Sequence, residues 1–570
     1  MSDEKSSECS VCKQPAVLKC SLCKDIAYCC KDHQKKDWKS HKNLCRPFEI
    51  KTDSKVGRYL VATREIPIEQ TIIQECPIIV GPKTHTEFEP HFIPCVGCYK
   101  PLPVENPPSR CTQCGWPACA THCPGLFNTK EHATECAILK LRKSFAVNKL
   151  DDFYRSYALT PLRCLLLQKR DPKKWKQLIE MESHIDKRGP DTEIYQIIEE
   201  NLVEYLYKNY ITPLKEFEDE SNIKILEDCS RKTIHKLCGV IDTNSLDIRL
   251  PNGVDIIGIY PTQFLMEHSC MPNVKHIFEQ SDDPTKQYRL CVKAARNIQK
   301  GEHLLNMYTH ALWGTQARLA HLKETKYFLC ECARCKDPTE FGTFISALKC
   351  MGTETKPCTD GYQLPINPLD LQSEWMCNKC QFKIEGETAE FLTNQLGEEI
   401  EMLQAKGPSV KELEQLLQKF AHFLHPNHFH IYAAKHSLIQ LYGYQQGYLP
   451  KQLSVDQLKR KMGMCRQLID ITEKIDPHFC RLSLYQAITC HELFLAQFEL
   501  IQRNWADQCF EKEREPYRDM LKECRVLIEK SKQVLGGELP GSPGFKLVND
   551  VFKNSQKELE RWIYDFKVNI

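Results

Sequence analysis

The sequence lacks the features that mark membrane, secreted and strongly charged proteins. No apolar run approaches the roughly 18–20 residues that a membrane-spanning helix requires. The first residues hold no apolar segment of the kind found in secretory signals, so we expect a cytoplasmic and/or nuclear protein with no membrane association. Lys and Arg number 77 and Asp and Glu number 75, a net charge of +2, and this balance argues against nucleic-acid binding through bulk charge.

The sequence is rich in cysteine, with 32 among its 570 residues. Hydrophobic residues make up 42% of the chain, which is enough to build cores, and the length predicts about three to five domains. A chain of this length does not need disulfide bonds, and thiols in the cytosol or nucleus stay reduced. Because most of the cysteines fall in four clusters with regular spacings, they predict zinc sites.

The first cluster, at residues 9–45, contains two Cys-x2-Cys pairs followed by two pairs whose members are four residues apart. A Cys-x2-Cys pair brings two thiolates to one tetrahedral zinc ion, and a spacing of four places both ligands on one helix face. These pairs predict two zinc ions, most simply with pair one joined to pair three and pair two to pair four. Cys30 is an alternative to Cys29, although the spacing to His33 favours Cys29. The predicted ligands are Cys9, Cys12, Cys20, Cys23, Cys29, His33, His41 and Cys45.

Residues between these ligands add a resemblance to a known family. Tyr28 beside Cys29, Gln34, and Trp38 three residues before His41 resemble the MYND finger over the whole of residues 9–45. The resemblance implies a module that binds protein partners. Lysines between residues 31 and 42 form a basic face, which we interpret as solvated; weak contact with nucleic acid is the alternative.

The second cluster, at residues 95–136, repeats the order of the first, with two Cys-x2-Cys pairs, a Cys-x3-Cys pair and a final His-x3-Cys. It resembles a second, diverged MYND-type module, and the repeated order predicts two further zinc ions. The predicted ligands are Cys95, Cys98, Cys111, Cys114, Cys119, Cys123, His132 and Cys136.

Short, β-branched segments bounded by Gly or Pro predict strands at 57–63, 71–75 and 78–82, and a long helical stretch follows at about 137–236. Later motifs are Glu267-His268-Ser269-Cys270-x-Pro272-Asn273, Gly301-Glu302-x5-Tyr308 and Cys330-x-Cys332-x2-Cys335. With the turn at Gly57, their order resembles a SET domain, and the finger places the chain among SET and MYND domain proteins. The inserted second cluster resembles the arthropod-specific SmydA-like branch.

This resemblance implies methyl transfer from S-adenosylmethionine to a lysine amine of a protein. Tyr308 occupies the position of the family's catalytic tyrosine; a satisfied core tyrosine is the alternative. Tyr260 and Phe328 would line the lysine channel. Cys270 would join Cys330, Cys332 and Cys335 as the fourth ligand of a structural zinc. The cofactor-binding residues implied are Gly57, Arg58, Tyr59, Asn244, Glu267, His268, Tyr308 and Phe328.

Two positions depart from the family pattern. Position 267 is Glu where Asn is usual, and position 59 is Tyr where many members have a second Gly. A carboxylate beside the cofactor would pair with its ammonium group or repel its carboxylate, and a tyrosine would crowd the backbone's approach to the cofactor. Both departures concern the cofactor half of the site, so they bear on catalysis and leave the zinc sites unaffected.

The remaining chain combines one more cysteine cluster with a helical region. Cys350, Cys358, Cys377 and Cys380 predict one further zinc, against the alternative of buried free thiols, which brings the expected total to about six ions. From residue 386 onward the apolar period is helical and predicts stacked, loosely tetratricopeptide-like hairpins. His425, His428 and His430 are interpreted as an inter-helix turn rather than a metal site.

These expectations define an α+β fold class: zinc fingers, a SET β-fold with a zinc-containing helical insertion, and an all-α C-terminal domain. The expected segments are a MYND finger at 9–45, SET parts at 50–94 and 237–312, a second zinc module at 95–136, a helical insertion at 137–236, a post-SET zinc segment at 313–340, a four-cysteine segment at 341–385 and helical hairpins at 386–570.

Two functions fit this organisation. The first is an S-adenosylmethionine-dependent protein-lysine methyltransferase of the SET-MYND type, with histones and transcriptional regulation as the expected context. The second is a catalytically weak or inactive adaptor that recruits protein partners like a co-repressor, with the SET fold as a scaffold. In both cases we expect a monomer that binds proteins through the finger. Glu267 and Tyr59, set against the retained Tyr308, separate the two functions.

Overall fold

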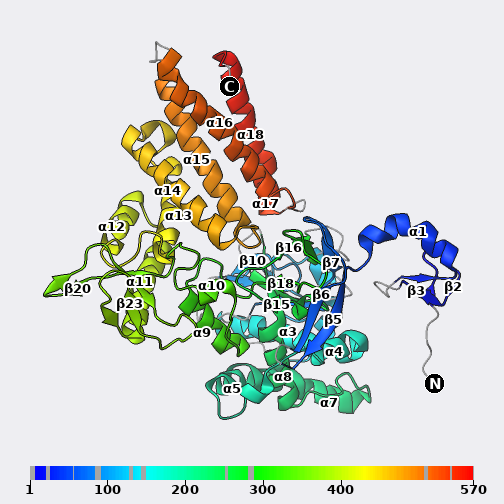
Figure 1. Cartoon of the computed structure of the whole chain (residues 1–570). Helices are drawn as coiled ribbons and strands as arrows, with labels where there is room; N and C mark the ends of the chain where they lie inside the picture. The colour runs from blue at the N-terminus through cyan, green and yellow to red at the C-terminus, as the bar shows by residue number, and fades with distance from the viewer. Residues whose placement is uncertain are drawn as a thin grey trace. The chain divides into compact units, whose positions relative to one another are not determined.

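A computed structural model describes residues 7–20, 26–54, 57–83, 92–127, 132–142, 149–250, 255–279, 288–505, 511–538 and 542–568 (Figure 1). The chain divides into two compact units. Unit 1 contains Met1–Ile72, Leu265–Ile277 and Val292–Ile570, and unit 2 contains Ile73–Phe264 and Phe278–Cys291. Within the described ranges, no helix combines the length and apolar character needed to cross a membrane.

The finger at the start of unit 1 has a very small core. Two short antiparallel pairs, β1 (Ser7–Glu8) with β2 (Pro15–Ala16) and β3 (Leu18–Lys19) with β4 (Ala27–Tyr28), precede helix α1 (Lys31–Leu44). Among its described residues, the buried apolar ones are Ala16, Ala27, Tyr28 and three cysteines. So few apolar side chains cannot offset the entropy of folding, so this finger depends on metal for its stability.

The strands expected at 57–63 and 71–75 are β6 (Gly57–Ala62) and β7 (Thr71–Glu75), and strands that were not predicted pair with them or lie in the same unit. β5 (Phe48–Asp53) pairs antiparallel with β6, and β15 (Glu267–His268) pairs parallel with β18 (Leu305–Asn306). β7, β16 (Val274–Glu279) and β17 (Arg289–Ala294) form a three-stranded sheet in the order β16-β17-β7. Helices α9 (Thr315–Lys326) and α10 (Ala333–Lys336) follow.

The four-cysteine segment is a small sheet of its own. Its order is β19-β22-β23-β24, with β19 at Leu348–Lys349, β22 at Tyr362–Pro365, β23 at Trp375–Cys377 and β24 at Lys383–Ile384. In the sequence, a hairpin of β20 (Gly352–Thr353) and β21 (Lys356–Pro357) separates β19 from β22.

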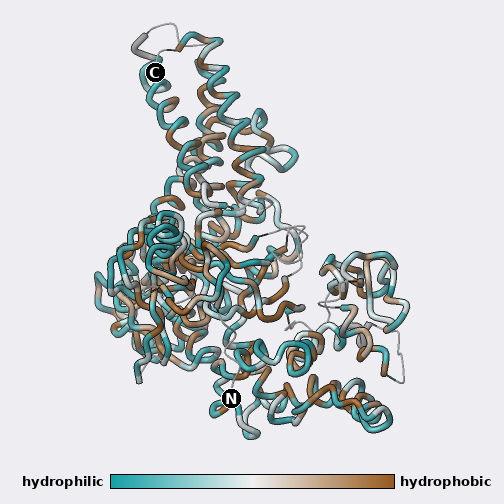
Figure 2. The backbone as a smooth tube through the Cα atoms, turned by 90° about the vertical axis from the view of Figure 1, so that its right-hand side faces the viewer, coloured by the Kyte–Doolittle hydropathy of each residue, from teal (hydrophilic) through white to brown (hydrophobic). Residues whose placement is uncertain are grey.

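The C-terminal region is helical, as expected. Capping boxes at Ser409 with Glu412 and at Ser454 with Gln457 start two of the helices. Helices α14, α15 and α16 lie side by side (Figure 1), and the tube of Figure 2 shows the alternation of hydrophobic and hydrophilic residues that lets each bury one face. The helices are α11 (Gly386–Ala405), α12 (Val410–Phe420), α13 (Phe429–Tyr444), α14 (Val455–Ile475), α15 (Ser483–Asn504), α16 (Glu511–Val534), α17 (Pro543–Lys546) and α18 (Lys553–Asp565).

Unit 2 contains a zinc module, a helical layer and a three-stranded sheet in the order β13-β14-β8. Strand β8 (Ile79–Pro82) packs closely on α3 (Lys149–Arg170), since a Cβ at Gly81 would lie 2.0 Å from the Thr160 hydroxyl oxygen. The strands are β8 (Ile79–Pro82), β9 (Phe92–Pro94), β10 (Pro101–Pro103), β11 (Ser109–Arg110), β12 (Pro117–Ala118), β13 (Ser245–Arg249) and β14 (Asp255–Ile259). The helices are α2 (His132–Leu139), α3 (Lys149–Arg170), α4 (Pro172–Ile179), α5 (Glu193–Ile198), α6 (Glu204–Leu206), α7 (Thr212–Ser221) and α8 (Arg231–Asn244).

Candidate functional site

The ligand sets expected from the spacings come together as compact groups of four. Ligand atoms within each group lie within 4.8 Å of one another. A tetrahedral zinc with Zn–S bonds of about 2.3 Å places its sulfurs about 3.8 Å apart, and the sulfur pairs here lie 3.5–3.9 Å apart. The donor sets and their spacing therefore suit zinc. The groups are Cys9, Cys12, Cys29 and His33; Cys95, Cys98, Cys119 and Cys123; Cys111, Cys114, His132 and Cys136; Cys270, Cys330, Cys332 and Cys335; and Cys350, Cys358, Cys377 and Cys380.

The first finger joins its pairs in the expected interleaved order. Pair one and pair three share a group, and Cys29 rather than the adjacent Cys30 belongs to it. In the other half, the Cys20 and Cys45 sulfurs lie 3.8 Å apart, and His41 is buried nearby on α1. Cys23, the fourth predicted ligand of that half, lies outside the described residues.

In the second module, a ligand is oriented by residues that the spacing does not reveal. His132 places Nε2 3.4 Å from the Cys111 sulfur and Nδ1 3.3 Å from the Glu135 carboxylate. Glu135 in turn accepts two hydrogen bonds, at 2.7 and 2.8 Å, from the buried guanidinium of Arg163 on α3. Burial acts to raise the pKa of Glu135, but the charge of Arg163 outweighs it and holds that pKa at about 2. A carboxylate that orients a ligating histidine is a common feature of zinc sites.

The Cys270 group has a similar support. Arg318 on α9 donates to the sulfurs of Cys270, at 3.2 Å, and Cys335, at 3.5 Å. Arg318 also donates to Glu340 at 2.8 Å, and both residues are fully buried. Hydrogen bonds from Cys330 and its neighbours, together with the charge of Arg318, hold the pKa of Cys270 far below its usual value. Four thiolates give a zinc site a net negative charge, and Arg318 offsets part of it.

Three aromatic residues of the SET-like segment lie close together: His268 on β15, Tyr308 just after β18, and Phe328 just after α9. The backbone N–H of Tyr308 donates to His268 Nδ1 at 3.0 Å, and the Tyr308 hydroxyl donates to the carbonyl oxygen of Met266. The His268 ring lies 5.3 Å from the Tyr308 ring and 5.9 Å from that of Phe328. Burial, and then the charge of Glu267, raise the pKa of the Tyr308 hydroxyl, so it stays protonated at neutral pH.

The two departures from the family pattern contact the same residue. The Glu267 carboxylate lies 2.5 Å from His303 Nδ1, and the Tyr59 ring stacks on the His303 ring with centroids 4.6 Å apart. The backbone brings His303 next to β6 as well, because Val61 of that strand forms an isolated antiparallel β-bridge with His303. Gly57, at the start of β6, adopts φ +74°, and within the described part of the chain no atom beyond its chain neighbours lies within 4 Å of a Cβ built there. Position 59 thus directs its side chain to His303, a partner that the sequence motifs do not reveal.

The remaining predicted residues have the following surroundings. Arg58 is exposed on β6. In unit 2, the Asn244 amide at the end of α8 donates to the carbonyls of Glu182 and Val240, at 2.8 and 2.7 Å. Tyr260 is fully buried, and its hydroxyl donates to the Tyr288 carbonyl at 2.7 Å. The proposed roles of these three residues stay predictions.

Comparison with known proteins agrees with the motifs. A model of the MYND finger matches residues 9–45 and one of the SET domain matches residues 57–309, so the second zinc module lies inside the SET match. SmydA-8 isoform A of Drosophila melanogaster, a SET domain-containing protein, is 29% identical over 58% of this chain and 64% of its own length.

More distant relatives carry enzyme names. The histone-lysine N-methyltransferase ASHR1 of Arabidopsis thaliana is 25% identical over 49% of this chain and 53% of its own length. The histone-lysine N-methyltransferase SMYD3 of Homo sapiens is 25% identical over 40% of this chain and 48% of its own length. The matched region thus spans less than two thirds of each of these relatives. The chain thus contains a MYND finger followed by a SET domain, the domain combination of SET and MYND domain proteins, and its similarity to SmydA-8 is consistent with the SmydA-like branch.

Proposed function

We propose that this protein is an S-adenosylmethionine-dependent protein-lysine N-methyltransferase. The observation that carries the proposal is the position of Tyr308, which presents a protonated hydroxyl at the Met266 carbonyl beside the rings of His268 and Phe328. Relatives with the same two domains are named lysine methyltransferases, which supports the same activity.

The chemistry asks for alignment more than for acid or base strength. S-Adenosylmethionine would supply an electrophilic methyl group bonded to a sulfonium. The lysine nitrogen would bond to that methyl carbon as the bond to sulfur breaks with its electron pair left on sulfur, so the site would have to hold the amine in line with the methyl group and the sulfonium. The Tyr308 oxygen and the Met266 carbonyl offer weak C–H···O contacts that would orient the methyl group.

The lysine must lose a proton before it attacks. An apolar surrounding disfavours the ammonium form, so aromatic walls such as Phe328 would help to deprotonate it. Water accepts the proton that the lysine ammonium loses. The neutral amine can then attack without a further base. Tyr308, whose hydroxyl stays protonated, acts by position and dipole rather than as a base.

The altered cofactor side is compatible with this reaction. His303 pairs with Glu267, which lessens the repulsion that a free carboxylate would exert on the carboxylate of S-adenosylmethionine. Tyr59 turns its ring onto His303, and the backbone at Gly57 stays open for close approach. The cluster Glu267–His303–Tyr59 therefore supports a working cofactor site in place of the inactive scaffold.

The first test is the Tyr308→Phe variant. We expect methyl transfer to fall by about 100-fold or more, because the oriented hydroxyl is lost while the ring stays. The measurement is transfer of labelled methyl from S-adenosylmethionine to histone and non-histone proteins, beside calorimetric titration of the cofactor. A matched variant, Tyr444→Phe, removes an exposed hydroxyl on α13 and should leave turnover unchanged.

Equal turnover by wild type and Tyr308→Phe would overturn the role of Tyr308. No cofactor binding by folded, zinc-loaded protein would favour the adaptor function instead. In either case, we propose a monomer in the cytosol and/or nucleus that binds protein partners through the finger and contributes to transcriptional regulation. Size-exclusion chromatography with light scattering tests the oligomeric state. Imaging of the tagged protein in cells tests its location.

A further inference from the structure

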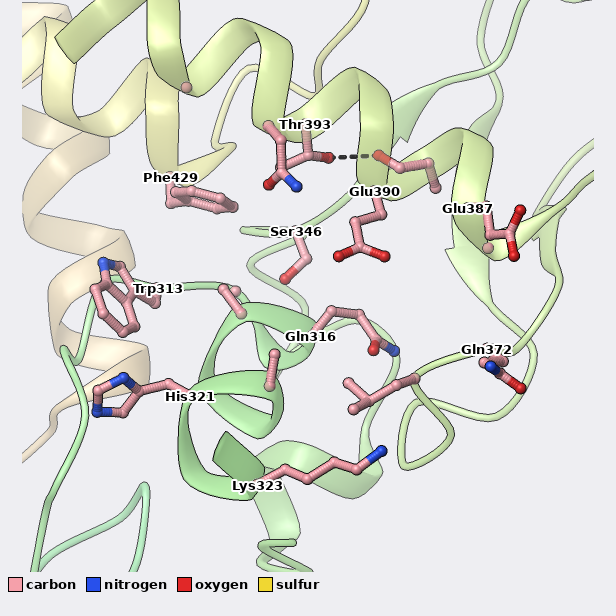
Figure 3. Close-up of a pocket in the computed structure, with 18 of the residues that line it drawn as sticks. Trp313, Gln316, His321, Lys323, Ser346, Gln372, Glu387, Glu390, Thr393 and Phe429 are labelled. Atoms are coloured by element: carbon pink, nitrogen blue, oxygen red, sulfur yellow. Dashed lines mark hydrogen bonds between the residues drawn. The ribbon is translucent and has the colours of Figure 1, made fainter. Parts of the chain in front are cut away.

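A cavity of about 1210 Å³ lies within unit 1, apart from the residues proposed for methyl transfer (Figure 3). Its walls come from α9, from the loop of the four-cysteine segment at 369–372, and from α11 and the start of α13. Tyr308, His268 and Phe328 are not among its lining residues. The cavity is thus a separate feature whose contents the proposed reaction does not explain.

One wall of the cavity is a row of carboxylates on α11. Glu387, Glu390, Glu398 and Glu401 all line it. Their separations of 3, 11 and 14 residues from Glu387 correspond to nearly whole helical turns, so they share one face of the helix. At 1.5 Å per residue the row is about 21 Å long, which matches about six residues of extended peptide.

The four carboxylates of this row differ in their ion pairing from a neighbouring carboxylate on the same helix. Among the described residues, none of the four makes an ion pair with a lysine, arginine or histidine, whereas the adjacent Glu399 pairs with Lys419 at 2.6 Å. Lys323, which lies across the cavity from Glu390 in Figure 3, is the one lysine of the lining, and the lining contains no arginine. Glu324 and Asp370 add further negative charge. The field inside the cavity therefore favours a cationic occupant.

Another part of the lining is apolar and offers a second kind of contact. Trp313 and Phe429 lie on the side away from Glu387 in Figure 3, and Trp313 is 37% exposed. Ala317 and Ala320 leave that face of α9 low, so that a side chain has room to lie over it. An exposed indole near carboxylates suits the guanidinium or ammonium groups of Arg and Lys, whose stems also bury apolar surface.

Gln316 points to the same class of ligand. Its Nε2 donates to the carbonyls of Pro368 and Asp370, at 3.3 and 3.4 Å. Its Oε1 is buried and accepts no hydrogen bond within the described part of the chain. A buried acceptor without a donor costs free energy, and a backbone N–H or an ammonium group entering the cavity would supply the donor.

We propose that this cavity is a docking groove for a lysine- and arginine-rich segment of a partner protein. The segment would lie extended along α11, with its cations on the four carboxylates and one side chain against Trp313. Nucleic acid does not fit this groove, because the carboxylates would repel its phosphates. The proposal holds whether or not the protein transfers methyl groups.

Fluorescence anisotropy tests this docking proposal. The probe is a labelled peptide of about ten residues in which Lys and Arg alternate with Ala, and the zinc-loaded full chain is titrated into it. We expect binding that weakens as salt rises from about 50 to about 300 mM. The triple variant Glu390→Gln, Glu398→Gln and Glu401→Gln should bind at least about tenfold more weakly, from the loss of three favourable charges. Glu399→Gln, on the same helix but outside the groove, should bind like wild type.

A second variant separates the groove from general attraction to negative charge. Trp313→Ala keeps every carboxylate, and we expect it to lose about three- to tenfold in affinity with circular dichroism unchanged. Equal binding by wild type and the triple variant would overturn the proposal, as would absence of binding to wild type at low salt. Spermine that competes as strongly as the peptide would also overturn it, because the groove would then bind any polycation and would not recognise a peptide backbone.

Discussion

At the residue scale, single side chains far apart in the sequence complete the sites that local motifs begin. His303 is 36 residues from Glu267, and it joins the two positions that depart from the family pattern. Arg318 is 48 residues from Cys270 and donates to its sulfur. Such contacts depend on how strands and helices are brought together, so the spacing of neighbouring residues could not reveal them.

The first prediction at this scale concerns His303. Replacing it with Ala leaves the Glu267 carboxylate without its partner beside the proposed cofactor site. We therefore expect S-adenosylmethionine to bind about fivefold more weakly, in line with about 1 kcal/mol for a partly exposed pair. Calorimetric titration measures it. The double variant His303→Ala with Glu267→Asn should recover the affinity. If both variants bind like wild type, Glu267 does not face the cofactor.

The second prediction concerns Gly361 in the four-cysteine segment. A Cβ at this position would lie 2.3 Å from the Cys377 sulfur and 2.6 Å from the Cys358 sulfur. Gly361→Ala should therefore remove one zinc ion from a total of about six, counted by mass spectrometry of the native protein. Gly463→Ala on α14 is the control, because nothing lies within 4 Å of its Cβ and alanine favours a helix by about 1 kcal/mol. A full zinc count in Gly361→Ala would contradict the proposed ligand set.

At the element scale, helix α3 and the second zinc module depend on each other. The module is too small to be stable alone, and α3 reaches it through the Arg163–Glu135 pair and through Arg155, which donates to the Gly115 carbonyl at 3.0 Å. The elements themselves were well predicted where a short pattern decides them. The strands at 57–63 and 71–75 and the helix after Ser409 follow from β-branched runs and from a capping box.

The prediction for this element is the Arg163→Met variant. Removing the guanidinium leaves the buried Glu135 carboxylate with only the His132 ring beside it, and loss of one partner of a buried ion pair costs about 3–5 kcal/mol. We expect the module to release its two zinc ions at a lower chelator concentration than in wild type, followed with a coloured zinc indicator. The double variant Arg163→Met with Glu135→Gln should recover much of the loss. Arg561→Met, at an exposed ion pair on α18, should have no effect. Unchanged zinc release from Arg163→Met would show that the module holds its metal without α3.

At the scale of the whole molecule, burial of neutral histidines makes stability depend on pH. Burial lowers the pKa of His276 to about 3 and that of His425, His430, His436 and His491 to about 4. The unfolded chain binds protons at these histidines below about pH 6.5, while the folded chain does not until about pH 4. Stability is thus full above pH 6.5 and is lost as the pH falls through that window.

We expect each such histidine to lower the free energy of unfolding by about 1.4 kcal/mol for each unit by which the pH falls between about pH 6 and 4.5. Urea unfolding of zinc-saturated protein, followed by circular dichroism at several pH values, measures the slope. His491→Gln, which keeps a polar partner for Ser555, should show a smaller slope than wild type. An identical slope in both proteins would mean that His491 is not held neutral.

The zinc groups show how far sequence alone reaches. The interleaved order of the ligands was predicted because Cys-x2-Cys pairs and helical four-residue steps are local geometry. The cavity beside α11 was not predicted. Its acidic row was readable from the helical period, but its apolar part combines Trp313 and α9, some 70 residues before α11, with Phe429 at the start of α13.

The Cys270 group has a consequence for the order in which the protein matures. Its ligands lie up to 65 residues apart, while the finger completes its own ligands within residues 9–45. Since a chain emerges from the ribosome from its N-terminus and metal binding drives folding, the finger can take its metal long before Cys335 is made. A ribosome stalled between these points would hold a nascent chain able to meet a binding partner but with its post-SET segment still unclosed.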